Sequence, residues 1–134
     1  MKFENRFQIR DERDVDTFSW NEHAGEWLVV RWPQRIQDAV AIEAAREQST
    51  ASKEICQLVD EGLVVAAKSQ VVPPMVSADS WTEGDGDEIV LRDVVLDPVQ
   101  SANANELAKL LGVSLDDLMF TFVTDGLRRR GLLG

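Results

Sequence analysis

Two short β-prone stretches, each ended by a proline, decide the fold predicted for this chain of 134 residues. They read Trp27-Leu28-Val29-Val30-Arg31-Trp32-Pro33 and Ile89-Val90-Leu91-Arg92-Asp93-Val94-Val95-Leu96-Asp97-Pro98. β-Branched and aromatic residues favour a pleated strand, and a proline cannot continue the hydrogen-bond ladder of a sheet. Each stretch therefore predicts one short strand that stops near its proline.

Two helices are predicted after each strand. The first helical stretch runs from about residue 34 to residue 48 in one half, and ends at Leu111 before the helix-breaking Gly112 in the other. Thr50 and Ser114 are good N-caps for the second helices. Apolar residues recur there at helical spacing and predict the core: Ile55, Leu58, Val59 and Leu63 in one helix, and Leu118, Met119, Phe122, Val123 and Leu127 in the other.

The two halves share this layout at a constant offset of 64 residues, the separation of Thr50 and Ser114. At the same offset, Glu61-Gly62-Leu63 matches Asp125-Gly126-Leu127. Strand, helix, turn and helix in about 40 residues is too small a unit to bury a core alone. The sequence therefore predicts a mainly α fold with a two-stranded antiparallel β-ribbon, a tandem ribbon-helix-helix that pairs its own two strands as an intramolecular pseudo-dimer. Pairing between two chains, as a homodimer, stays open.

Four segments follow from this layout. Residues 27–66 and 89–134 are the two ribbon-helix-helix units, residues 1–26 are an N-terminal leader or arm, and residues 67–88 are a solvated acidic linker. The net charge is −10, to which the leader contributes −3 and the linker −4. Alternating carboxylates at Glu83, Asp85 and Asp87 resemble a calcium loop, but the glycine and glutamate that an EF-hand requires are missing.

Composition excludes several classes of function. With one histidine (His23) and one cysteine (Cys56), the chain has neither a histidine or cysteine metal site nor a conventional catalytic triad. No phosphate loop appears either, so we expect no enzyme, no metal and no cofactor. No run of 18 apolar residues exists, and the N-terminus is charged, which predicts a cytoplasmic protein without membrane contact.

The first unit resembles a known family through Val30-Arg31-Trp32-Pro33, Asp38 and Ser52-Lys53-Glu54-Ile55-Cys56-Gln57 with Val59. This pattern is similar to the Arc repressor family of phage ribbon-helix-helix transcription regulators over residues 27–62. The second unit resembles only the general ribbon-helix-helix pattern, through Leu-Gly-Val-Ser at 111–114.

The resemblance implies double-stranded DNA as partner, with the ribbon in the major groove and its outer side chains reading bases. Carried over by position, the base-reading residues are Trp27, Val29, Arg31, Leu91, Asp93 and Val95. The implied phosphate anchor is the start of the second helix, Thr50, Ala51, Ser52 and Lys53. The family's buried Arg–Glu–Arg triad falls on Ser49, Glu54 and Leu58, so Glu54 is expected to be buried without its arginines. Its pKa is then raised by desolvation, unless it is solvated or Arg46 or Lys53 pairs with it and lowers the pKa.

Two functions remain open at this point. One is an Arc-like DNA-binding repressor in which Arg31 is the one side chain that suits a guanine. The other is a scaffold that has lost DNA reading and binds a protein partner through an apolar ribbon face, as an antitoxin-like inhibitor, a phage accessory protein or a DNA mimic.

Overall fold

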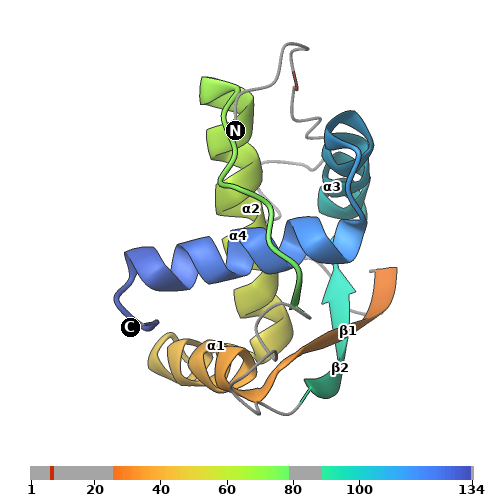
Figure 1. The fold of residues 1–134 in the computed structure, drawn as a ribbon. Helices are drawn as coiled ribbons and strands as arrows, with labels where there is room; N and C mark the ends of the chain where they lie inside the picture. Colours follow the sequence, from red (N-terminus) through yellow and green to blue (C-terminus); the bar gives the residue numbers. More distant parts are fainter. Residues whose placement is uncertain (1–6, 8–25, 79–88, 134) are drawn as a thin grey trace, which may run out of the picture.

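The computed structural model describes Phe7, residues 26–78 and residues 89–133. Its elements follow in the order β1 (Glu26–Pro33), α1 (Gln34–Arg46), α2 (Ala51–Ser69), β2 (Ile89–Leu96), α3 (Pro98–Leu111) and α4 (Leu115–Arg129) (Figure 1). The predicted class, mainly helical with a two-stranded antiparallel sheet, is confirmed. None of these helices is long and apolar enough to cross a membrane.

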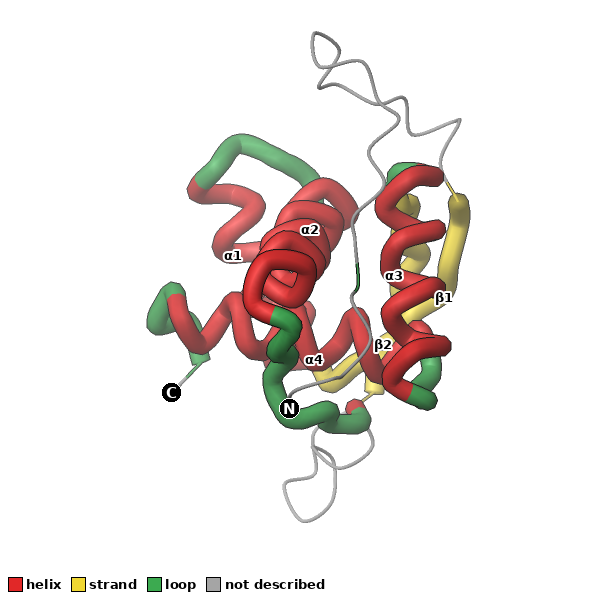
Figure 2. Tube along the Cα trace, turned by 90° about the horizontal axis from the view of Figure 1, so that it is seen from above, coloured by secondary structure: helices red, strands yellow, loops and turns green. Residues whose placement is uncertain are grey.

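The sheet is a ribbon of β1 and β2, paired antiparallel within one chain. Near its middle Val29 lies opposite Asp93. Successive side chains point to opposite faces of a strand, and the inward face is buried at Val30, Trp32, Val94 and Leu96. The helices gather on this side of the ribbon and leave the other face open (Figures 1 and 2).

The predicted caps begin and end the helices. The Thr50 hydroxyl accepts the N–H of Lys53 at 3.2 Å, and the Ser114 hydroxyl accepts the N–H of Asp117 at 3.1 Å. Each bond satisfies one of the amides that a helix start leaves without a partner. Gly112 ends α3 in the left-handed conformation, at φ 70°, where a residue without Cβ is favoured.

A close crossing of α2 and α4 holds the two halves together (Figure 1). At this crossing Gly62 of α2 faces the ring of Phe122, and Gly126 of α4 faces the side chain of Leu58. A Cβ at either glycine would lie within 3.0 Å of the opposing side chain. The two glycines are 64 residues apart, as are Leu58 and Phe122, so the contacts are reciprocal, as in a two-fold interface.

The helices of each half also pack against the strand of the other half. In one direction, the indole N–H of Trp32 donates to the Asp116 carboxylate at 3.2 Å, and its ring lies 5.8 Å from that of Phe120. In the other, the Cys56 thiol donates to the carbonyl of Val95 at 3.1 Å. Each strand is therefore fixed by the half to which it does not belong.

The predicted linker needs correction at its beginning. Residues 67–69 are the last turn of α2, which ends at Ser69 rather than at residue 66. After it, Val72 and Ala78 are buried, and the N–H of Val76 donates to the hydroxyl of Thr121 at 3.0 Å. Val72, Met75 and Val76 pack against the core, although the net negative charge of the segment predicted that it would be solvated. The alternating carboxylates lie outside the described residues.

One residue of the predicted leader belongs to the core. Phe7 is buried, and the side-chain amide of Gln70 holds its backbone. The Phe7 N–H donates to Gln70 Oε1 at 3.0 Å, and Gln70 Nε2 donates to the Phe7 carbonyl at 3.1 Å. The rest of residues 1–25, including His23, lies outside the described part.

Glu54 occupies the buried position that the sequence predicts for it. It is 1% exposed, and neither carboxylate oxygen has a hydrogen-bond donor. Burial, together with the carboxyl groups of Glu47 and Glu43, raises the pKa of Glu54 to about 7, against the opposing charge of Arg130. Two carboxyl groups can form a hydrogen bond with each other only when one of them is protonated. Uptake of one proton therefore allows a hydrogen bond between Glu47 and Glu54, which the two ionised groups cannot form.

The crossing of α2 and α4 predicts that Gly62→Ala is destabilising. The new methyl group would overlap the buried Phe122 ring, so we expect a loss of about 1–3 kcal/mol in unfolding free energy, despite the better helix propensity of alanine. Urea denaturation followed by circular dichroism measures the change. The exposed control Gln57→Ala, on the same helix, should stay within about 0.5 kcal/mol of the parent. Equal stability of the two variants would contradict the close crossing.

The raised pKa of Glu54 predicts a specific pH dependence in buffer that contains a chelator. The folded state holds this proton more tightly than the unfolded chain, so the stability from this group is full below pH 4.5 and is lost as the pH rises through about 7. Glu54→Gln should therefore match the parent near about pH 5 and be more stable near about pH 8, by on the order of 2–3 kcal/mol.

Denaturation midpoints at the two pH values measure the effect of Glu54→Gln. Glu106→Gln, an exposed change on α3, is the matched control and should show no such difference. A Glu54→Gln protein less stable than the parent near the higher pH would show that the carboxylate is stabilised in the fold.

Candidate nucleic-acid interface

The candidate interface begins with the outer face of the ribbon. Trp27 and Val29 are each 61% exposed and Leu91 is 63% exposed. Arg31 and Asp93 are exposed on the same face. Five of the six positions carried over as base readers thus lie together on one open surface.

The sixth position, Val95, was predicted wrongly as a base reader. Its side chain is 2% exposed and cannot reach a groove. The alternation of buried and exposed residues along β2 stops after Asp93, and Val94, Val95 and Leu96 are all buried. Val95 also lies directly opposite Trp27, and cross-strand neighbours are close enough for an indole to cover a valine.

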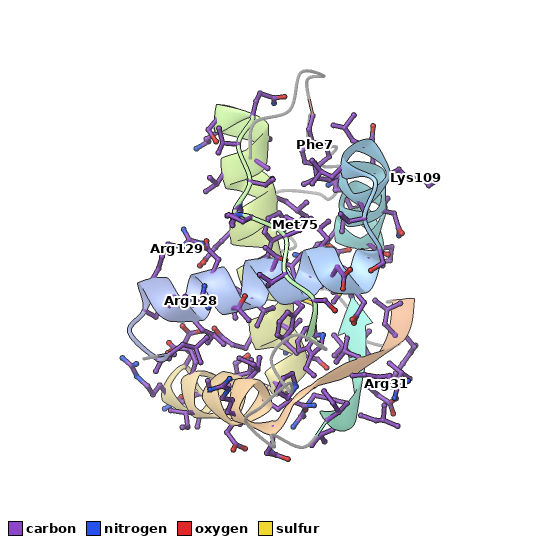
Figure 3. The ribbon with its side chains drawn as sticks, viewed as in Figure 1. Phe7, Arg31, Met75, Lys109, Arg128 and Arg129 are labelled. Carbon is purple, nitrogen blue, oxygen red and sulfur yellow. The ribbon has the colours of Figure 1, made fainter. Side chains whose placement is uncertain are left out.

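Charge on this face comes from two residues of opposite sign. Arg31 lies on β1 and points away from the helices (Figure 3), while Asp93 lies on β2 opposite Val29. Arg31 makes no ion pair with another described residue, so its guanidinium is available to a ligand. Arginine can bind guanine through two hydrogen bonds, and aspartate can accept one from cytosine. The apolar side chains beside them offer contacts only to thymine methyl groups or to another apolar surface.

The residues predicted as a phosphate anchor lie at the start of α2. Thr50 Oγ1 accepts the N–H of Lys53, and the Thr50 carbonyl accepts the N–H of Glu54. No hydrogen bond within the described chain takes the N–H of Ala51 or Ser52. These amides stand at the positive end of a helix dipole, beside the exposed Lys53 ammonium. The structure therefore presents two amides and one cation together, as an anion site requires.

The corresponding start of α4 differs in charge. Ser114 caps it, but the first turn carries Asp116 and Asp117. Asp116 accepts the indole N–H of Trp32 and so fixes α4 to β1. Carboxylates stabilise a helix start by interaction with its dipole, but they repel phosphate. Only one of the two helix starts suits a nucleic-acid backbone.

Sequence reasoning missed a polar pair that joins α1 to β2. The Gln37 amide donates to the carbonyl of Val90 at 2.6 Å, and its Oε1 accepts from Arg92 Nε at 2.6 Å. Gln37 is 3% exposed. The sequence signal that could have indicated this contact is the position of Gln37, next to Ile36 on the buried face of α1. The pair fixes the beginning of β2 and turns Arg92 towards the helices, away from the outer face.

Two of the three arginines at the end of α4 form ion pairs within the protein. Arg130 Nη2 binds Glu61 Oε1 at 2.7 Å, and Arg129 Nε binds Asp125 Oδ2 at 3.3 Å. Arg128 and Arg129 lie in the last turn of α4 (Figure 3), where the helix dipole favours positive charge. The run at 128–130 is therefore not a free basic patch.

Comparison with known proteins gives no relative. No family model, no curated protein and no solved structure matches this chain.

Proposed function

We propose that the chain is an intramolecular ribbon-helix-helix pseudo-dimer that acts as an Arc-like DNA-binding transcription regulator. Reciprocity supports the pseudo-dimer. Val29 and Asp93, which face each other in the ribbon, are 64 residues apart, and the contacts of Gly62 and Gly126 obey the same offset. A two-fold interface of a true dimer pairs residues in this way.

One observation carries the proposal of DNA binding: the open ribbon face and the α2 start offer donors that suit DNA. Arg31 projects from the ribbon as a base reader, and the free amides of Ala51 and Ser52, with Lys53, suit a phosphate. A ribbon of two strands fits the major groove. The second unit lacks these donors, because at the 64-residue offset Val95 stands in place of Arg31, and Asp116 and Asp117 stand in place of Ser52 and Lys53. The proposed contact is therefore asymmetric.

A second candidate function rests on the apolar character of the same face. Trp27, Val29 and Leu91 are each more than 60% exposed, and exposed apolar clusters mark protein-binding surfaces. The net charge of −10 adds long-range repulsion of DNA. In this alternative the ribbon docks against a protein, as an antitoxin-like inhibitor, a phage accessory protein or a DNA mimic would.

Selection from a random duplex pool, followed by fluorescence anisotropy across a salt series, separates the two candidates. For a DNA regulator, the logarithm of the binding constant should fall with the logarithm of the salt concentration, with a slope of roughly −2 to −4. The slope is shallow because only one of the two helix starts suits phosphate. Arg31→Ala should weaken binding to the selected site by about 1–3 kcal/mol and relax the preference at one guanine. Thermal stability should change little, since the Arg31 side chain is exposed.

Lys68→Ala is the matched control for Arg31→Ala, because it removes one exposed positive charge from the last turn of α2. It should leave selectivity unchanged. Equal losses on selected and random DNA would make Arg31 a phosphate contact instead of a base reader. If the protein retains no duplex from the random pool at about 50 mM salt, DNA binding is contradicted and the protein-docking alternative is favoured.

A further inference from the structure

Three glutamates converge where α1 passes into α2. Glu43 lies in the last turn of α1, Glu47 is its C-cap, and Glu54 lies in the first turn of α2. A tight turn brings them together: the N–H of Ser49 donates to the carbonyl of Ala44 at 2.8 Å. As a result, one carboxylate oxygen from each glutamate lies within 4.8 Å of those of the other two.

Glu54 is the feature that distinguishes this cluster from an ordinary acidic surface. It is 1% exposed, it faces the other two carboxylates, and both of its oxygens lack a donor. An ionised carboxylate buried without a partner is costly, and such groups are normally paired or coordinate a metal. Among the described carboxylates, only Glu54 has buried oxygens without a partner.

The nearby cations do not fill this role. Arg46 Nη1 binds Glu43 Oε2 at 3.2 Å, and Arg130, which reaches this region from α4, binds Glu61 at 2.7 Å. Neither arginine donates to Glu54. A carboxylate has two oxygens and about four lone-pair sites, so Glu43 can keep its bond to Arg46 and still bind an ion.

We propose that Glu43, Glu47 and Glu54 form a site for a divalent cation of the size of Ca²⁺. Two oxygens bound to one calcium ion at about 2.4 Å lie at most about 4.8 Å apart, which is the limit that the three carboxylates meet. Carboxylate oxygens suit hard cations such as Ca²⁺ and Mn²⁺. Glu47 is exposed, so water can complete the coordination from that side. The ion supplies the positive charge that the family's arginines would supply around the buried glutamate.

Isothermal titration of the chelator-stripped full chain with Ca²⁺, and separately with Mn²⁺ and Mg²⁺, tests this site. We expect one saturable Ca²⁺ site per chain and a rise in melting temperature with Ca²⁺ concentration, because the ion binds only the folded state. Glu54→Gln and Glu43→Gln should each weaken binding by at least about tenfold, the loss usual even for residues that only support a metal ligand. Circular dichroism checks that each variant is folded.

Two controls locate the ion. Glu106→Gln removes one negative charge from α3 and should keep the parent affinity. Asp85→Asn tests the alternating carboxylates of the linker, and it should also keep the parent affinity. On the unmodified chain, Mn²⁺ should selectively broaden the amide resonances of residues 43–54. No saturable binding, unchanged affinity in Glu54→Gln, or loss in Asp85→Asn with broadening around residues 83–87 would each overturn the proposal.

Discussion

The close crossing of α2 and α4 keeps the two halves of the chain in contact and thereby holds the ribbon in place. Neither half has enough surface of its own to bury a core, and the crossing lets each half cover the other. It requires a residue without a side chain at Gly62 and Gly126, because Phe122 and Leu58 fill the space that a Cβ would take. With the helices at this distance, the start of α4 reaches Trp32 of β1, and α2 reaches Val95 of β2. The ribbon is thus held by contacts that cross between the halves.

The sequence predicted those parts of the fold that have local signals. Alternation, prolines and caps located the strands, the starts of α2 and α4 and the Gly112 break. The missed features depend on contacts between distant residues. Val95 has the same alternating pattern as Leu91, and only the packing at the end of β2 buries it. The linker was predicted to be solvated from its net negative charge, although the residues just after Ser69 are apolar. No local sequence signal indicates that Gln70 binds the backbone of Phe7.

The candidate site was predictable to a similar degree. Position along the strand placed Arg31 and four other residues on the open face, and the Thr50 cap located the start of α2, where the phosphate anchor stays a prediction. Charge then distinguishes two halves that share the element order strand, helix, helix. The first unit presents Arg31, Lys53 and free amides, whereas the second presents Asp93, Asp116 and Asp117. Glu54 extends this asymmetry into the core, where it is buried without a partner and Leu118, its counterpart at the 64-residue offset, is apolar.

Oxidative cross-linking of a Val29→Cys/Asp93→Cys double variant tests most directly whether the two halves pair within one chain. Directly opposed residues of an antiparallel pair have Cα atoms about 4.5–5.5 Å apart, a separation that a disulfide spans. Cys56 is buried and should not compete. Oxidation should give a monomer on a non-reducing gel, with a disulfide-linked peptide that joins positions 29 and 93, and neither single variant should give it. Covalent dimers from the double variant, or no cross-link at all, would contradict intrachain pairing in this register.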